Sequence, residues 1–164
     1  MENENIHALL SEMLEKATNE ERKNLYSLLE GIEKKQNNHY KTYLAGYMGI
    51  KSKLLDENTY ESIIPNRELI HNPLHVVHGG VTASLIDIAM GSLVHQSLPP
   101  NKAAVTSEMN IHYLAKGSGK DLRCRSHVLF KSETRWVVKA DVLRDDDTII
   151  ATATGNFMII PRKV

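Results

Sequence analysis

The sequence predicts an α+β domain in which a largely antiparallel sheet packs against one long central helix. Residues 81–94 form a nearly apolar segment of helical character, and four segments of alternating polarity follow it, joined by short turns. No strand–helix–strand unit is repeated along the chain, so a parallel sheet is not expected. The long helix should therefore cover one face of the sheet, and a helical extension should precede this domain.

The composition is that of a water-soluble protein with no charge excess. Of the 164 residues, 41% are hydrophobic and 24% charged, with 20 Lys+Arg against 20 Asp+Glu. A net charge of zero disfavours nucleic acid or an anionic membrane as the main partner. The one cysteine, Cys124, excludes an internal disulfide and suits a reducing compartment, and no apolar run is long enough to span a bilayer. We expect a cytoplasmic protein with neither a nucleic-acid nor a membrane partner.

Residues 1–38 predict a helical N-terminal extension, separate from a domain at residues 40–164. Two apolar stripes recur at helical spacing; they comprise Ile6, Leu9, Leu10, Met13, Leu14 and Ala17, and then Leu25, Leu28, Leu29 and Ile32. Between them, Thr18 and Glu21 have the spacing of a capping box, which begins a second helix. These helices should pack on the domain or on a neighbouring chain, and a partner-docking arm is the alternative.

From Tyr40 onward the period of the pattern changes to that of strands. Residues 44–54 alternate in polarity, residues 56–58 are turn formers, and a second alternation over residues 60–64 ends at Pro65. Two strands joined by a short turn predict a hairpin.

The central segment over residues 81–94 has only four polar side chains, which are Thr82, Ser84, Asp87 and Ser92. A helix that is apolar nearly all round is expected to be buried on every side. A carboxylate is almost never fully buried without a partner, so Asp87 is the first candidate for a functional group. The alternative is a structural carboxylate that accepts hydrogen bonds from strand hydroxyls.

Four strands are expected after this helix. They cover residues 105–113, 122–130, 136–142 and 149–160, with turns at 116–120, 131–134 and 145–147. In the first of them, Val105, Met109 and Tyr113 fall on the apolar side of the alternation and Thr106 on the polar side.

Asn72, His78-Gly79-Gly80 and Asp87, followed by the strand that begins Val105-Thr106-Ser107, closely resemble the motif of the hotdog-fold acyl-CoA thioesterases of the PaaI type. The resemblance extends over roughly residues 42–160. It implies a hotdog fold, with an antiparallel sheet wrapped around a long central helix. It also implies hydrolysis of acyl-CoA thioesters to free acid and CoA, by homodimers that commonly assemble into homotetramers.

The resemblance also implies roles for single residues. Asp87 would act as general base or nucleophile, and Asn72 and the Gly79 N–H would polarise the thioester carbonyl. Thr106 would hold the attacking water. His78 would act directly or would orient the start of the helix, and Gly80 beside Gly79 permits close approach of the substrate.

The spacing of His78 and Asp87 constrains how such a site is built. Nine residues of helix correspond to about two and a half turns and roughly 13.5 Å, which puts the two side chains on opposite sides. They cannot form one catalytic pair within a subunit. The sequence therefore predicts an active site shared between two chains, in a homodimer or a dimer of dimers.

Coenzyme A carries phosphates, so a basic rim is expected beside the site. The turn that contains Lys131, Ser132, Thr134 and Arg135 is the best candidate, together with Gly80. No separate cofactor is expected, because CoA is part of the substrate.

The motif region suggests two other functions and raises the question of a metal site. A non-catalytic hotdog module that binds an acyl thioester or a small aromatic ligand is the main alternative, and a hotdog dehydratase fits the motif less well. His71, His75 and His78 lack the spacing of zinc ligands, so no metal is expected. The identity of the acyl group is not encoded in any motif.

Overall fold

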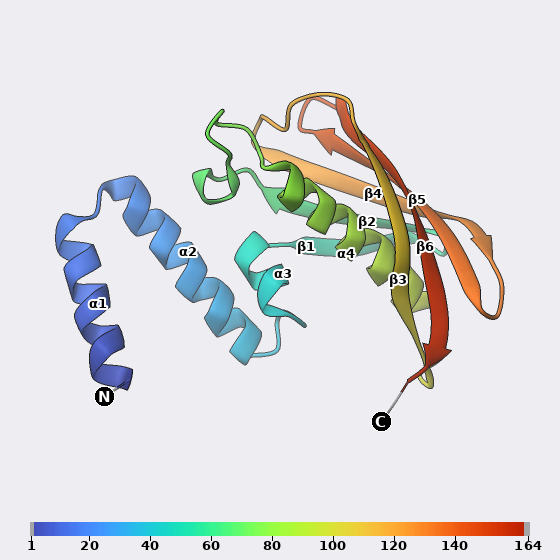
Figure 1. Cartoon of the computed structure of the whole chain (residues 1–164), viewed down its shortest axis with the longest axis horizontal. Helices are drawn as coiled ribbons and strands as arrows, with labels where there is room; N and C mark the ends of the chain where they lie inside the picture. Colours follow the sequence, from blue (N-terminus) through green and yellow to red (C-terminus); the bar gives the residue numbers. More distant parts are fainter. Residues whose placement is uncertain (1, 163–164) are drawn as a thin grey trace. The chain divides into compact units, whose positions relative to one another are not determined.

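The computed structural model describes residues 2–162 of the chain. The ends of the two expected segments, residues 1, 163 and 164, lie outside the described residues. The chain divides between Gly49 and Ile50 into two compact units. The first is helical, and the second contains the sheet and the long helix (Figure 1).

The first unit contains helices α1 (Glu2–Lys16), α2 (Asn19–Gln36) and α3 (Tyr43–Met48). The expected capping box is confirmed: the Thr18 hydroxyl oxygen accepts the Glu21 N–H at 3.2 Å, and the Glu21 carboxylate accepts the Thr18 N–H at 2.7 Å. Helices α2 and α3 touch at a glycine pair, since a Cβ on Gly31 would lie 2.6 Å from the carbonyl oxygen of Gly46. Only glycine permits this approach of the two backbones.

The expected strand over residues 44–54 is wrong in its first half, because residues 43–48 are helical. The Thr42 hydroxyl accepts the Ala45 N–H at 3.1 Å and so caps α3 at its start. Gly49 ends the helix in the left-handed conformation, with a φ of 64°. The two caps and the contact of Gly46 with Gly31 outweigh an alternation that is too short to specify a strand.

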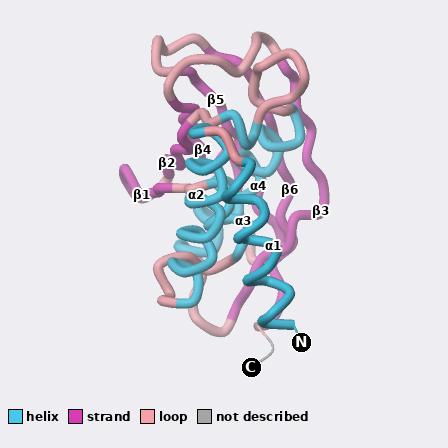
Figure 2. The backbone as a smooth tube through the Cα atoms, turned by 90° about the vertical axis from the view of Figure 1, so that its left-hand side faces the viewer, coloured by secondary structure: helices cyan, strands magenta, loops and turns pink. Residues whose placement is uncertain are grey.

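The second unit is a six-stranded antiparallel sheet with one long helix on it. The strands are β1 (Lys51–Asp56), β2 (Thr59–Pro65), β3 (Lys102–Tyr113), β4 (Asp121–Lys131), β5 (Arg135–Arg144) and β6 (Ile149–Pro161). Their order in the sheet is β1-β2-β4-β5-β6-β3, which confirms the hairpin and the four later strands. Helix α4 (Gly79–Ser97) lies along one face of this sheet, and the strands are magenta in Figure 2. The α+β class is confirmed.

Helix α4 is buried on one side and not, as expected, all round. Its side toward the sheet is fully covered and comprises Leu85, Ile86, Ala89, Met90, Leu93 and Val94. The opposite stripe is only half-buried and carries Ala83, Ser84, Asp87, Ile88, Gly91 and Ser92. A single sheet covers only one side of a helix, so this small-residue stripe around Asp87 stays accessible in one chain. Within residues 2–162, no helix combines the length and the apolar character needed to cross a membrane.

Strand β3 lies at the edge of the sheet and contains a bulge at Ser107. Thr106 pairs with Phe157 and Glu108 with Asn156, so Ser107 has no partner in the register. A bulge shifts the alternation by one residue. Before it Thr106 faces α4, and after it Tyr113 does, as their hydrogen bonds to that helix show. The expected face shared by Val105 and Tyr113 is therefore wrong.

Candidate active site

The first turn of α4 leaves one backbone donor unused. His78 is the N-cap residue; its Nδ1 accepts the Gly80 N–H at 3.2 Å, and its carbonyl accepts the N–H groups of Val81 and Thr82 at 2.9 and 3.1 Å. Within residues 2–162, the N–H of Gly79 has no hydrogen-bond partner. Gly79 therefore offers a free donor at the positive end of the helix.

The hydrogen bond between His78 and Gly80 limits the roles open to both of these sequence-predicted residues. Because Nδ1 accepts a hydrogen bond, the proton of the neutral ring is on Nε2. The ring thus orients the helix start, which is the second of the two roles considered for His78. The N–H of Gly80 donates to the same contact and is therefore not a free donor.

Asn72 supplies a second unused donor close to this turn in sequence. Its Oδ1 accepts the N–H of Leu74 at 2.9 Å, and its own N–H donates to the carbonyl of Val76 at 2.9 Å. His75 in this loop has a φ of 55°, in the left-handed region. These contacts fix the Asn72 side chain through its oxygen, while its Nδ2 group donates to no residue in the described part of the chain.

Asp87 lies halfway along the accessible stripe of α4 and is paired with a strand hydroxyl. The Thr106 hydroxyl donates to Asp87 Oδ1 at 2.8 Å. Asp87 is half-buried, and its Oδ2 accepts no hydrogen bond from residues 2–162. One oxygen is therefore anchored, and the other is open to a ligand.

The two groups of residues do not meet within one chain. Gly79 and Asp87 are eight residues apart on α4, which corresponds to about 12 Å along the helix axis. On β3, Thr106 contacts Asp87, whereas Tyr113, about 20 Å further along the strand, contacts Gly79. A single subunit thus presents a donor half-site and a carboxylate half-site, well separated.

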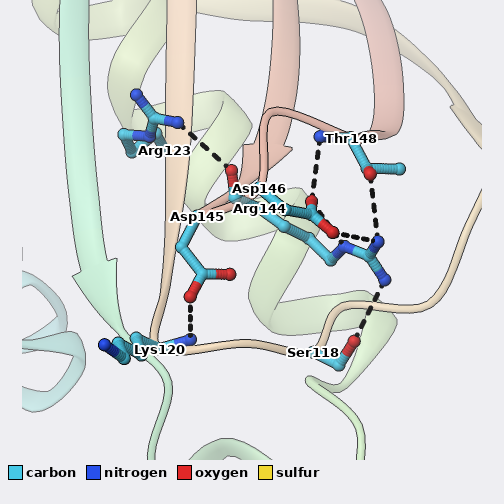
Figure 3. Close-up of polar contacts among 7 residues, drawn as sticks. All are labelled: Ser118, Lys120, Arg123, Arg144, Asp145, Asp146 and Thr148. Atoms are coloured by element: carbon cyan, nitrogen blue, oxygen red, sulfur yellow. Dashed lines mark hydrogen bonds and ion pairs between the residues drawn. The ribbon is translucent and has the colours of Figure 1, made fainter.

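A polar cluster joins the loop at residues 116–120 to the turn between β5 and β6 (Figure 3). Arg144 binds both carboxylate oxygens of Asp146, at 3.1 and 2.6 Å, and donates to the Ser118 hydroxyl at 3.2 Å. The hydrogen bonds from the Arg144 guanidinium and from the Thr148 N–H lower the pKa of Asp146 to about 2. Asp145 accepts the Lys120 N–H at 3.1 Å, and a Cβ on Gly119 would collide with its carboxylate.

The same loop holds the segment that contains the donor half-site. The carbonyl of Gly117 accepts the Val77 N–H at 2.8 Å, immediately before the helix cap. Asn66 donates to the carbonyl of Gly119 at 2.7 Å, and its Oδ1 lies 2.6 Å from His71 Nε2. The cluster therefore supports the position of residues 66–78. The sequence pattern did not predict this support, because the residues of the cluster are far apart in sequence.

The turn expected to contact CoA lies level with Asp87 across the sheet. Thr106 pairs with Phe157, Phe157 with Trp136, and Trp136 with Lys131. The Nζ atom of Lys131 lies 5.6 Å from the centroid of the Trp136 ring. The Ser132 hydroxyl oxygen accepts the Arg135 N–H at 3.1 Å.

A cavity of about 290 Å³ adjoins this turn. It is lined by Asn101, Lys102, Glu133, Thr134, Ile159, Ile160 and Pro161. Thr134 is one of the expected CoA contacts, whereas Lys102, which follows the Pro99-Pro100-Asn101 break, was not among them. A second cavity, of about 360 Å³, lies in the helical unit and contains none of the motif residues.

Two of the three histidines of the motif region, His71 and His78, are engaged in other contacts. His71 is paired with Asn66 and His78 with Gly80. Among residues 2–162, no three His, Cys, Asp or Glu side chains are grouped as metal ligands.

The chain is similar to proteins of known structure over most of its length. The BH2602 protein from Bacillus halodurans, crystallised with CoA, is 37% identical, with a TM-score of 0.86 over 93% of this chain and 99% of that one. The relative named "Putative esterase VNG_1336C" from Halobacterium salinarum is 32% identical over 127 residues, 71% of this chain and 83% of its own length.

A third protein shows the fold alone, since it is only 22% identical. It is a phenylacetic acid degradation-related protein from Ralstonia eutropha, with a TM-score of 0.68 over 77% of this chain and 97% of that one. The sheet and helix of the second unit thus form the hotdog fold of the PaaI-like thioesterases, which confirms the resemblance seen in the sequence. The model of the family described as Domain of unknown function (DUF4442) matches residues 34–159, and the chain belongs to that family.

Proposed function

We propose that the protein hydrolyses acyl-CoA thioesters to the free acid and CoA, with Asp87 as general base or nucleophile. The relatives support a thioester or ester hydrolase in general terms, and the 37% identical relative was crystallised with CoA. The observation that carries the proposal is the unused Gly79 N–H at the start of α4, because a free donor at a helix N-terminus suits a developing oxyanion.

The proposed chemistry assigns one step to each group. As a base, the open Oδ2 of Asp87 takes a proton from water while the water oxygen bonds to the thioester carbon; the C–S bond then breaks and the CoA sulfur leaves with that proton. As a nucleophile, Oδ2 bonds to the carbon and expels the CoA thiolate, and water then hydrolyses the resulting mixed anhydride. The Gly79 N–H and the Asn72 Nδ2 group donate to the carbonyl oxygen as negative charge develops on it. Thr106 holds the other carboxylate oxygen and so fixes the orientation of Asp87.

The separation of the half-sites supports a site shared between two copies of the chain. Strand β3 is an edge strand, and its neighbouring stripe on α4 is accessible. Antiparallel pairing of β3 with its copy, centred on Asn110 and with Ser107 bulged out of the ladder, puts Thr106 of one chain opposite Tyr113 of the other. Each Asp87 then faces the Gly79 turn of the partner subunit, and one two-fold axis generates two sites.

The basic turn between β4 and β5 is proposed to bind the CoA portion of the substrate. Lys131, Ser132, Thr134 and Arg135 lie on it, and Lys102 lines the cavity beside it. Ammonium, guanidinium and hydroxyl groups suit phosphate oxygens.

Thiol release from a panel of acyl-CoAs tests the reaction. We expect turnover on at least one of them, and a loss of about 100-fold or more in kcat for Asp87→Asn with oligomer and CoA binding retained. Asp141 is a matched control, because it accepts the Thr152 hydroxyl at 2.6 Å as Asp87 accepts that of Thr106. Asp141→Asn should leave turnover unchanged.

A panel without turnover, with wild type and Asp87→Ala binding acyl-CoA equally well, would instead identify a non-catalytic binding module. The Thr106–Asp87 hydrogen bond is the observation that favours this alternative, since it gives one oxygen of the carboxylate a structural partner.

Subunit mixing tests the shared site. Asn72→Ala and Asp87→Asn chains are each expected to be nearly inactive, yet a mixed dimer contains one intact site. Random exchange should therefore restore about a quarter of the wild-type activity per chain. A stable monomer with full activity would contradict the shared site.

A further inference from the structure

Tyr113 contacts the donor half-site from the end of strand β3. Its hydroxyl donates to the carbonyl oxygen of Gly79 at 2.9 Å, and a Cβ on Gly79 would lie 3.6 Å from its ring. The side chain thus donates a hydrogen bond to the first residue of α4, and the hydroxyl end of its ring borders the space beside Gly79.

Burial does not explain this contact. Tyr113 is 55% exposed, and its neighbour Leu114 is also exposed. An aromatic side chain left this accessible contributes little to the core, whereas its hydroxyl is aimed at one specific backbone group.

The bulge at Ser107 is what brings Tyr113 onto this face. Without the shift of register between Thr106 and Glu108, Thr106 and Tyr113 would lie on opposite faces of β3. The bulge therefore allows one strand to supply a partner to Asp87 and a partner to Gly79, one for each half-site.

We propose that Tyr113 is a positioning residue for the oxyanion donor and a wall of the acyl pocket. By holding the Gly79 carbonyl it keeps the first turn of α4 from fraying and so fixes the direction of the Gly79 N–H. Its ring borders the space over Gly79 through which an acyl group would approach. This inference rests on the proposed function and names the residue that sets the geometry of the donor.

In the paired arrangement proposed above, Tyr113 also lies beside Thr106 of the partner subunit. The ring would then stand between the donor half-site of its own chain and the carboxylate half-site of the other. An acyl group bound there is in contact with the ring, so the volume of this side chain should influence which acyl chains are accepted.

The first test does not need turnover. The chain has nine glycines, so ¹⁵N-glycine labelling gives a simple amide spectrum in which Gly79 and Gly80 are assigned by substitution. Tyr113→Phe keeps the ring and removes the hydroxyl. We expect the Gly80 amide to exchange with solvent about fivefold faster, as for the loss of one hydrogen bond, and the Gly79 amide resonance to shift.

The second test separates positioning from binding. Tyr113→Phe should lower kcat about tenfold while KM changes by less than about twofold, because the hydroxyl acts on the donor to the oxyanion. Tyr113→Leu should in addition move the acyl-chain preference toward bulkier groups.

His112→Leu is the matched control, since His112 is the adjacent exposed residue on the opposite face of β3. It should leave the glycine amides and kcat unchanged. Glycine amides in Tyr113→Phe identical to those of the wild type would overturn the proposal. A wild-type protein with no turnover would instead contradict the proposed function, and the amide measurement would still decide the role of Tyr113.

Discussion

Thr106 donates its hydroxyl hydrogen to Asp87 Oδ1 over 2.8 Å, and this bond joins the middle of α4 to the edge strand β3. It is a contact between residues nineteen positions apart in the chain. Thr106→Val should lower kcat by about 10-fold or more and the free energy of unfolding by about 1 kcal/mol, because the carboxylate loses its anchor. Steady-state kinetics and urea unfolding measure the two effects.

Thr106→Ser should retain the wild-type kcat and free energy of unfolding, since it keeps the hydroxyl. Thr152→Val removes the equivalent hydroxyl from Asp141 and should affect stability alone. Equal kinetics for Thr106→Val and the wild type would show that the contact is structural only.

The N-cap at His78 predicts a stability effect that is separable from catalysis. His78→Ala removes the acceptor of the Gly80 N–H and should cost about 1 kcal/mol. His78→Asn supplies another good capping side chain and should recover most of this, which thermal unfolding can measure. If His78→Asn restores stability and kcat together, the ring acts as a cap. Restored stability with kcat still low would show that the imidazole takes part directly.

Gly79→Ala separates the space needed for folding from that needed for substrate. The added Cβ would meet the Tyr113 ring at 3.6 to 3.7 Å, which is ordinary van der Waals contact, and Gly79 has no positive φ. The fold should therefore be unaffected, and the midpoint of thermal unfolding should stay the same or rise slightly. We expect kcat/KM to fall at least about 10-fold, because the methyl group blocks approach to the Gly79 N–H. Unchanged kcat/KM would remove Gly79 from the proposed site.

The surroundings of Glu61 on β2 predict how the free energy of unfolding depends on pH. Burial alone would raise the pKa of this carboxyl, but the hydrogen bond from Arg125 at 2.8 Å and the charges of Arg125 and Lys53 hold it below its ordinary value. The folded state therefore favours the ionised carboxylate, which stabilises the protein above the ordinary glutamate pKa of about 4.3.

This contribution should be lost as the pH falls through the lowered pKa of Glu61. Glu61→Gln lacks the titrating group, so its free energy of unfolding should change less than that of the wild type between about pH 6 and about pH 3. Urea unfolding at a series of pH values measures this. Parallel curves for the two proteins would contradict the assignment.

The elements of the second unit were predictable because their patterns are local. Turn formers at residues 56–58, 116–120 and 145–147 separate the strands, and the apolar run before Ser97 is too long for a strand. The segment around Gly46 was not predictable, since the contact with Gly31 of α2 that favours a helix there is tertiary.

The candidate site, like the fold, was predictable from the sequence only in part. The sequence by itself placed Asn72, His78, Gly79 and Asp87 on one short segment, and the fixed rise of a helix was enough to keep its two ends apart. Only the tertiary structure decided that His78 uses its Nδ1 to cap the helix and that Gly79 keeps the free N–H. It also decided that Thr106 and Tyr113 share the helix-facing side of β3, because a bulge changes which side chains face α4 without leaving a mark in the alternation.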